Sequence, residues 1–244
     1  MHTDALVFSP HPDDAELYCG GTILSLLASG HTVGVVDVTR GELSTRGTLR
    51  TRAAETRNAS RALGLSVREN LAIADGNVEN SPANRLRVIR VLRRYRPVTV
   101  LLPYPADRHP DHGNTSMLVR EAAFQSGLAK VASVDRGKAQ GAFRPPRLFY
   151  YMMTDDFQPT LIVDISAVFE RKMEAIRCYR SQFHTEAGTT KGPDTYISTP
   201  DFMDSLAARS RRLGFLIAAQ YGEGFVPVQA FGIDASALIT SRPR

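Results

Sequence analysis

Two short stretches of this 244-residue sequence place histidine and aspartate side chains where they can hold a metal or move a proton. The first is Ser9–Glu16 (SPHPDDAE) and the second is Asp107–His112 (DRHPDH). A catalytic zinc typically takes three His, Asp or Glu ligands and leaves a fourth position for water. A further carboxylate near such a site can take a proton from that water. Together the two stretches predict a metal site suited to hydrolysis.

The first stretch supplies two candidate ligands, His11 and Asp14. The third comes from the second stretch, as either His109 or His112. Asp13 lies next to a ligand and is the candidate general base, because a carboxylate that does not bind the metal is needed for proton transfer. A single His-Pro turn or Asp-Asp helix cap is usually only structural. Two such turns, each after an expected strand, favour the metal site.

Both stretches follow short apolar runs and precede helical patterns. Ala5–Phe8 and Val98–Leu102 are expected to be buried strands, and helices are expected over 14–29 and 113–130. In a parallel sheet of order 3-2-1-4-5, the first and fourth strands are neighbours, and the loops at their carboxyl ends face one crevice. The active site is therefore expected at the carboxyl ends of these two strands.

The rest of the chain continues the alternation of strands and helices. This pattern predicts an α/β fold, a Rossmann-like and mainly parallel sheet flanked by helices, with residues 1–244 in one domain. Further strands are expected at 32–38, 69–73, 148–153, 160–165 and, briefly, around 228–233. Further helices are expected at 50–63, 84–95, 166–181 and 199–220, and loops at 39–49, 131–146 and 183–199.

Composition narrows the class of protein. No apolar run approaches the roughly 20 residues that span a bilayer, and the first residues lack the basic and apolar regions of a signal peptide. A cytoplasmic protein without a membrane partner is expected. Of the 30 basic residues 26 are arginines, spread along the chain, so the net charge of +5 does not predict nucleic-acid binding.

The loop over 40–52 follows the second strand, so we expect it to overhang the same crevice. Its polar and charged side chains can grip a polyhydroxylated or anionic substrate. The candidate substrate contacts in it are Glu42, Ser44, Arg46, Arg50 and Arg52. The alternative is a solvated basic loop.

Three motifs resemble one known family. HPDDAELxCGGT, TRGELSTRGT and PYxxDRHPDH are similar to those of the LmbE-like, or PIG-L, zinc-dependent N-acetylglucosamine deacetylases. Later segments, VDIS, YxSQF and YGEGF, extend the resemblance over most of the chain. Within the superfamily the sequence most resembles the bacillithiol-biosynthesis deacetylases, which remove acetate from N-acetylglucosaminyl-malate.

The resemblance implies roles for individual residues. The family's three metal ligands fall on His11, Asp14 and His112, and its general base falls on Asp13. The oxyanion-stabilising histidine, the aspartate that orients it and a substrate-contacting arginine fall on His109, Asp111 and Arg52. A tyrosine that assists catalysis in some relatives falls on Phe202, for which Tyr104 and Tyr196 are candidate substitutes. Tyr104 and Arg108 complete the expected substrate contacts.

The expected reaction follows from this set. Zn²⁺ polarises the acetamide carbonyl, although Fe²⁺ and Co²⁺ also suit the ligands. Asp13 takes a proton from the attacking water, and protonated His109, held by Asp111, stabilises the oxyanion. The expected substrate is N-acetylglucosaminyl-malate, a small acetylated amino-sugar conjugate whose malate is read by the loop arginines. The resemblance also implies a homo-oligomer, such as a hexamer.

Three alternatives remain. The first is a deacetylase of another acetylated amino sugar or small amide. The second is a non-catalytic sugar-binding module, although such a module needs neither Asp13 nor His109. The third is a nucleotide-binding oxidoreductase, which requires a glycine-rich phosphate loop after the first strand. Here that turn is Ser-Pro-His-Pro-Asp-Asp, whose acids repel a pyrophosphate.

Overall fold

The central sheet is built on short strands that are buried along their length. The structure, a computed structural model, describes residues 2–184 and 193–236. All five residues of β1 (Ala5–Ser9) and of β2 (Val33–Asp37) are buried, as are the last four of β4 (Thr99–Pro103). Strands that are apolar on both faces must be covered on both faces, which is the arrangement of a parallel α/β sheet.

The sheet has seven strands in the order β3-β2-β1-β4-β7-β9-β8. The remaining strands are β3 (Val67–Asn70), β7 (Arg147–Tyr151), β8 (Leu161–Asp164) and β9 (Gly222–Pro227). The first five strands in this order pair in parallel, and β9 pairs antiparallel with both β7 and β8. The predicted α/β fold and the order 3-2-1-4-5 of the parallel part are confirmed.

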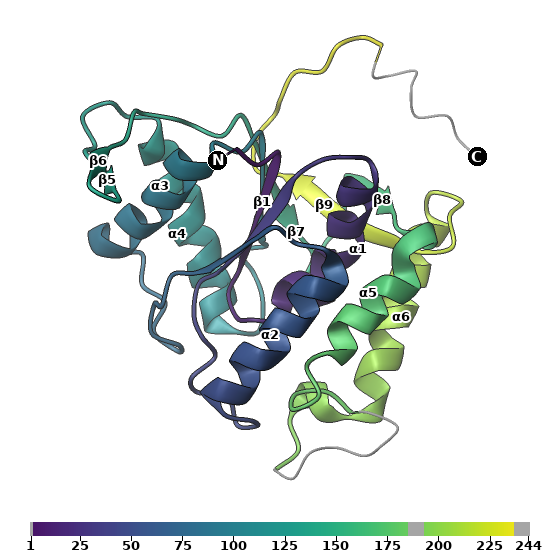
Figure 1. Cartoon of the computed structure of the whole chain (residues 1–244). Helices are drawn as coiled ribbons and strands as arrows, with labels where there is room; N and C mark the ends of the chain where they lie inside the picture. Colours follow the sequence, from purple (N-terminus) through teal and green to yellow (C-terminus); the bar gives the residue numbers. More distant parts are fainter. Residues whose placement is uncertain (1, 185–192, 237–244) are drawn as a thin grey trace.

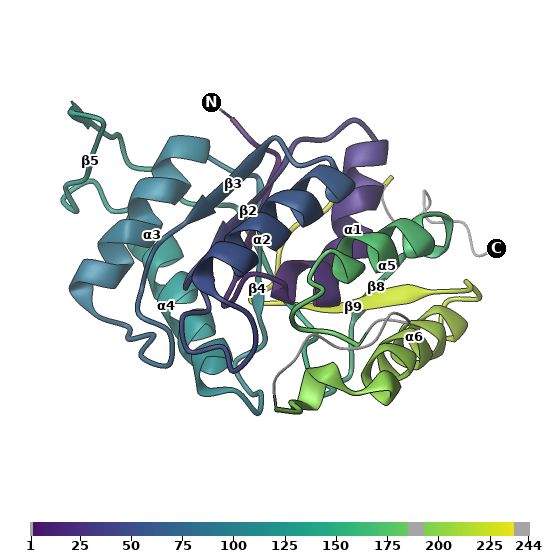
Figure 2. The same ribbon diagram turned by 60° about the horizontal axis from the view of Figure 1, so that its bottom comes forward.

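Helices cover both faces of the sheet (Figure 1). One layer contains α3 (Pro82–Tyr95) and α4 (Pro110–Ser126). The other contains α1 (Asp14–Ala28), α2 (Leu49–Leu63), α5 (Phe169–Arg177) and α6 (Pro200–Phe215). Figure 2 shows the two groups on either side of the sheet, and each encloses its own apolar cluster against it. None of the helices in the described part of the chain is long and apolar enough to cross a membrane.

Several boundaries differ from those predicted. The last strand is β9 rather than a strand around 228–233, because the glycine-containing sequence GEGFVP is ordered by its two antiparallel neighbours. β3 begins and ends earlier than expected, α5 and α6 are shorter, and a small hairpin of β5 (Val134–Asp135) and β6 (Lys138–Ala139) forms within the expected loop. Helix α4 begins at Pro110, which places three residues of the second stretch, Pro110, Asp111 and His112, in its first turn.

Helix α1 is interrupted at Cys19, whose φ of −143° and ψ of 17° are not helical. The backbone N–H groups of Gly21 and Thr22 both donate to the carboxylate of Glu223, at 2.9 and 2.7 Å, and so does the Thr22 hydroxyl at 2.7 Å. Lys172 of α5 pairs with the same carboxylate at 2.7 Å. Glu223 of β9 therefore caps the second half of the first helix.

Candidate metal centre and active site

The first stretch leaves β1 through a tight turn. Ser9 organises this turn, since its hydroxyl donates to the His11 carbonyl at 2.6 Å and accepts from the Ala15 N–H at 3.1 Å. Asp13 follows with a φ of +132°, a conformation that residues other than glycine adopt only when their surroundings enforce it. The turn therefore fixes the directions of the Asp13 and Asp14 side chains at the start of α1.

The second stretch is fixed by its own carboxylate. Asp107 accepts from the N–H groups of Thr154 at 2.9 Å, Asp155 at 3.1 Å and His109 at 3.2 Å. The same carboxylate lies 2.6 Å from Nδ1 of His112. This arrangement holds the β4–α4 turn and orients the His112 ring, as carboxylates commonly do for metal-binding histidines.

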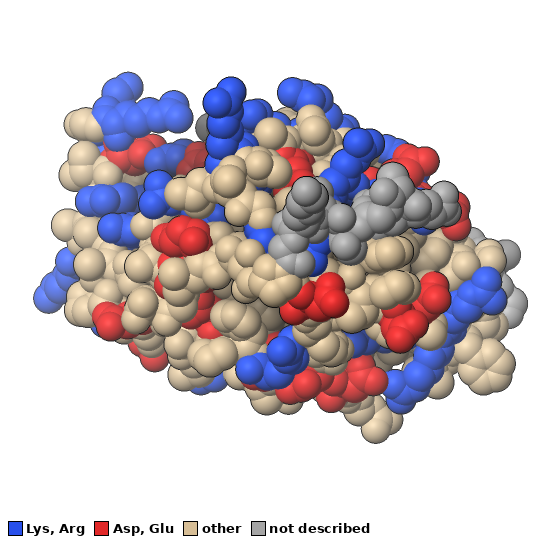
Figure 3. Space-filling view, turned by 90° about the horizontal axis from the view of Figure 1, so that it is seen from below, with Lys and Arg blue, Asp and Glu red and all other residues tan. Residues whose placement is uncertain are grey.

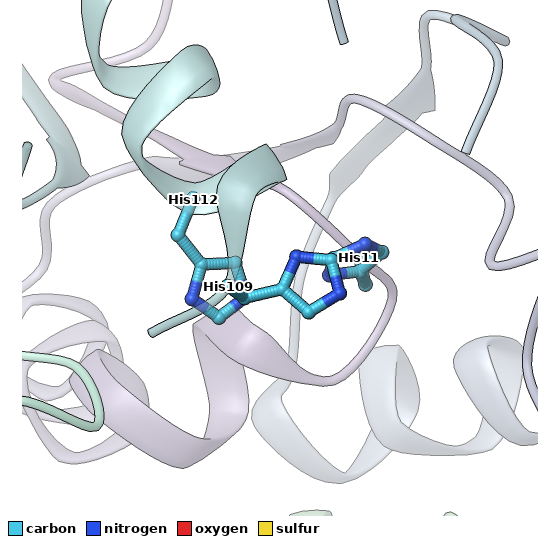
Figure 4. Close-up of side chains that lie close together, drawn as sticks. All are labelled: His11, His109 and His112. Atoms are coloured by element: carbon cyan, nitrogen blue, oxygen red, sulfur yellow. The ribbon is translucent and has the colours of Figure 1, made fainter. Parts of the chain in front are cut away.

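Pairing of β1 with β4 brings the two stretches together at the carboxyl ends of the strands. Figure 3 views the molecule from this end, with acidic side chains across the middle of the face and basic ones mostly toward its edges. Figure 4 shows His109 and His112 at the start of α4, facing His11 from the turn after β1. The ring centroids of His11 and His109 are 4.7 Å apart, and those of His109 and His112 are 4.9 Å apart.

Asp14 lies near two of these histidines. Oδ2 of Asp14 lies 3.2 Å from Nδ1 of His11 and 3.6 Å from Nε2 of His112. Ligands bonded to a tetrahedral zinc at ~2.0–2.1 Å lie ~3.3 Å from one another, so each of these two separations is close to that between ligands of one ion. His11, Asp14 and His112 stay the predicted ligand set.

Two further carboxylates face the other nitrogen of His11. Nε2 lies 3.1 Å from Asp75 and 3.5 Å from Asp111. Burial alone lowers the pKa of His11, but hydrogen bonds to Asp111, Asp14 and Asp75 raise it well above its usual value. Ligand atoms of His11, Asp75 and Asp111 also lie within 4.8 Å of one another, as do those of the three histidines. This surplus of negative charge suits a divalent cation.

Asp75 was missed by the sequence reasoning. Its carboxylate also accepts from the Leu43 N–H at 2.8 Å, and thus connects the loop after β2 to His11. One signal could have found it: Asp75-Gly76 follows the third strand, at the same edge of the sheet as the two histidine turns. The sequence around it lacks a second histidine or aspartate, so the residue did not stand out.

Asp13 is buried beside this centre. Arg52 donates to its Oδ2 at 2.9 Å and to the Pro12 carbonyl at 2.8 Å. Burial raises the pKa of Asp13 to about 6, with the charge of Asp14 adding to the rise and that of Arg52 opposing it. A carboxyl group of this pKa can exchange protons near neutral pH. The Arg52 side chain, predicted to contact substrate, is occupied with Asp13.

His109 differs from its predicted state. Burial lowers its pKa, and the charges of His11 and His112 lower it further. Its Nδ1 accepts the backbone N–H of Asp111 at 3.2 Å, which leaves Nε2 as the donor of a neutral ring. The Asp111 carboxylate accepts instead from the N–H groups of Gly76 at 2.7 Å and Val78 at 3.3 Å. The expected protonated His109, oriented by the Asp111 carboxylate, is thus corrected to a neutral ring oriented by the Asp111 backbone.

The predicted substrate contacts divide into two groups. Ser44, Arg52 and Arg108 line a cavity of about 390 Å³ that also contains the three histidines, Asp13, Asp14 and Asp75. Glu42 accepts from the backbone N–H groups of Arg40 and Asp75, and therefore shapes the loop. Arg46 is buried and donates to the carbonyls of Ser181 and Pro193, both at 3.1 Å. The predictions that Glu42 and Arg46 reach the substrate are corrected, since their side chains are used within the protein and lie outside the cavity lining.

The aromatic residues singled out from the sequence lie at different distances from the cavity. Arg108 lies over the ring of Tyr196, 4.3 Å from its centroid, and both residues line the cavity. Tyr104 instead packs against Tyr150 and Phe157, away from the lining. Phe202 is buried against Phe183. Of the two candidate tyrosines, only Tyr196 reaches the cavity, and part of the expected variable loop, residues 185–192, lies outside the described residues.

Comparison with known proteins agrees with this geometry. The model of the GlcNAc-PI de-N-acetylase (PIG-L) family matches residues 6–123, which include both histidine stretches. A diacetylchitobiose deacetylase from Thermococcus kodakarensis is 32% identical over 194 residues, which are 73% of this chain and 69% of that protein. The chain belongs to the PIG-L family of deacetylases.

Two further relatives extend the comparison. A Bacillus cereus protein described as a probable N-acetyl-alpha-D-glucosaminyl L-malate deacetylase 2 is 27% identical over 205 residues, covering 77% of this chain and 86% of the relative. The crystal structure of a conserved protein from Thermus thermophilus superposes with a TM-score of 0.83 at 37% identity. That match covers 96% of this chain and 98% of the Thermus chain, so the PIG-L fold extends over nearly the whole sequence.

Proposed function

We propose that this PIG-L family member is a metal-dependent N-deacetylase that removes the acetyl group from an N-acetylglucosaminyl conjugate, with N-acetylglucosaminyl-malate as the expected substrate. One observation carries the proposal. Oδ2 of Asp14 lies near ligand separation from a donor atom of both His11 and His112, directly beside a buried carboxylate whose pKa is about 6. A sugar-binding module has no use for that carboxylate, whereas amide hydrolysis needs a group that takes up and returns a proton.

The proposed ligands are His11, Asp14 and His112, with Zn²⁺ as the expected metal and Fe²⁺ or Co²⁺ as substitutes. When bound, the ion supplies Lewis acidity toward the acetamide carbonyl and lowers the pKa of the attacking water. Asp107 holds the ring of His112, and Asp75 holds the ring of His11. These contacts restrict the orientation of both imidazoles.

The protein's own residues move the proton and stabilise charge. Asp13 accepts the proton of the attacking water, and because Arg52 occupies Oδ2, the proton goes to Oδ1. The same carboxyl group then gives the proton to the amine that leaves. His109 donates its Nε2–H to the oxygen on which negative charge develops. The ion pair with Arg52 fixes Asp13 in its strained backbone conformation, so the base is in place before substrate binds.

We propose that Arg108 recognises the malate group of the conjugate. Arg46 and Arg52 are occupied, whereas Arg108 lies at the rim on the ring of Tyr196 and has no carboxylate partner in the described ranges 2–184 and 193–236. A guanidinium that faces a cavity can form a bidentate pair with a malate carboxylate. A neutral chitobiose unit offers no such group. The family relatives act on both kinds of substrate by description, so this contact is the discriminating one.

The test compares release of free amine from N-acetylglucosaminyl-malate and from N,N′-diacetylchitobiose, before and after chelation and with metal added back. Chelator-sensitive turnover of either compound supports the deacetylase. The malate assignment requires that kcat/KM be higher for the malate conjugate than for diacetylchitobiose. It also requires that Arg108→Gln lower kcat/KM for the malate conjugate and leave that for diacetylchitobiose unchanged. A protein that binds metal yet releases amine from neither compound would redirect the search to other acetylated amino sugars. Binding of sugar without turnover would favour the binding module.

A further inference from the structure

A second cavity, of about 490 Å³, lies beside the metal pocket and is lined by residues of α2, β3 and the end of β2. Arg52 belongs to the lining of both cavities. Five arginines line the second cavity, namely Arg40, Arg52, Arg57, Arg61 and Arg68. Only two carboxylates, Asp37 and Glu69, line it with them. This cavity is therefore electropositive, in contrast to the acidic metal pocket.

Both carboxylates are already used by other groups. Asp37 accepts a bidentate pair from Arg68, with both N–O distances at 2.9 Å. Glu69 accepts from Arg94 at 2.6 and 2.7 Å. Neither acid is thus available to neutralise the remaining arginines on the rim.

The three rim arginines have no carboxylate partner among the residues that the structure describes. They are Arg40, Arg57 and Arg61, and all three are exposed. Arg61 reaches only the side-chain oxygen of Asn58, at 2.9 Å. Arg57 and Arg61 lie one helical turn apart on α2, a spacing at which like charges destabilise a helix. An anion between them would relieve this repulsion.

The inner wall contains a buried guanidinium with an unused donor. Arg52 is only 4% exposed, and while its two terminal nitrogens bind Asp13 and Pro12, its Nε has no hydrogen-bond partner in the described structure. A buried N–H without a partner is costly and calls for an acceptor. This observation is independent of the rim charges, and it adds an unused donor on a residue that lines the arginine cavity as well as the metal pocket.

We propose that this arginine cavity binds a small multivalent oxyanion, of the phosphate or oligocarboxylate type. Guanidinium groups match the geometry of both anions by paired N–H donors. The metal pocket is less suited to this role, because Asp13, Asp14 and Asp75 line it, and an anion there depends on the metal or on Arg108. Since Arg52 also holds Asp13, an occupant of the arginine cavity would share a guanidinium with the base of the neighbouring site.

The experiment is isothermal titration of the metal-loaded protein with inorganic phosphate, and separately with succinate, at ionic strength held constant with chloride. Arg57→Gln/Arg61→Gln removes two rim charges. Arg171→Gln/Arg177→Gln is the matched control, because it removes two exposed arginines of one helix that lie outside the cavity lining. Circular dichroism checks that all proteins fold, and Arg57→Lys/Arg61→Lys keeps the charge but loses the paired donors.

We expect at least one of the anions to bind the wild type and the control equally. Binding by Arg57→Gln/Arg61→Gln should be weaker by about tenfold or more, with the lysine variant in between. Binding of phosphate alone assigns the site to phosphate esters, and equal binding of succinate assigns it to oligocarboxylates. Failure of both anions to bind overturns the proposal. Unchanged affinity in Arg57→Gln/Arg61→Gln also overturns it, because the anion then binds elsewhere, for example at the metal.

Discussion

Replacement of Glu223 with glutamine should destabilise the protein far more than removal of its partner Lys172. The two side chains are 3% and 1% exposed, so neither charge can be screened by water. Glutamine keeps the shape of the side chain and one acceptor, but the Lys172 ammonium then remains buried without a counter-charge. Breaking a buried ion pair from one side costs about 3–5 kcal/mol.

Lys172→Met instead leaves the Glu223 carboxylate buried without its lysine partner. The Glu223 carboxylate retains three donors, the N–H groups of Gly21 and Thr22 and the Thr22 hydroxyl, at the N-terminus of the second half of α1. These donors and the helix dipole stabilise the negative charge. Methionine also fills the volume of the lysine stem. The loss is therefore the charge-assisted hydrogen bond alone, about 1.5–3 kcal/mol.

Urea denaturation followed by far-ultraviolet circular dichroism measures both values, because the chain has no tryptophan to report on unfolding. The double variant Lys172→Met/Glu223→Gln completes the cycle and should be more stable than Glu223→Gln alone, since it removes the uncompensated ammonium. The reasoning is refuted if Lys172→Met costs as much as Glu223→Gln, or if the double variant is the least stable of the three.

Three other changes test the site and the packing around it. Asparagine is chosen to replace Asp13 because it tolerates a positive φ better than alanine does. The Asp13→Asn protein should bind a full equivalent of metal, and its kcat should be lower by about 10²–10⁴. Loss of metal, measured by atomic absorption, would instead make Asp13 a ligand. Asp107→Asn should weaken metal affinity by about 10–100-fold in competition with a chromogenic chelator, because it releases the His112 ring; unchanged affinity would contradict that role. Gly21→Ala should lower the free energy of unfolding, measured by urea denaturation, by about 1–3 kcal/mol, since the new Cβ would lie 2.7 Å from Ile165. An unchanged free energy of unfolding would show that Ile165 can repack without cost.

Much of the fold could be predicted from local signals. Proline turns after the apolar runs at 5–8 and 98–102 marked the two strand ends, and the rules of parallel sheets placed those strands side by side. The convergence of the two histidine stretches then followed from topology alone. β9 could not be placed from the sequence, because its glycines interrupt the alternation of apolar and polar residues that marks a strand. Its extended conformation depends on pairing with β7 and β8.

The finer chemistry of the site depends on contacts between distant segments. The sequence does not show that Arg46 is directed at the carbonyls of Ser181 and Pro193 rather than at a ligand. Nor does it show that the Asp111 carboxylate is used by the N–H groups that follow Asp75. Residue type and spacing identified the groups that can do chemistry, whereas their protonation and hydrogen-bond partners required three-dimensional packing.

The cap that Glu223 provides for α1 also bears on how the chain acquires its structure. The carboxylate and the helix that it caps are separated by 201 residues, so β9 must emerge from the ribosome before α1 is complete. Until then, the interrupted helix that carries Asp14 lacks a partner for the N–H groups after Cys19. Contacts this distant in sequence slow folding. Helix α1 is thus synthesised long before the residue that completes it, and a nascent chain that ends before β9 lacks the cap of the helix that carries Asp14.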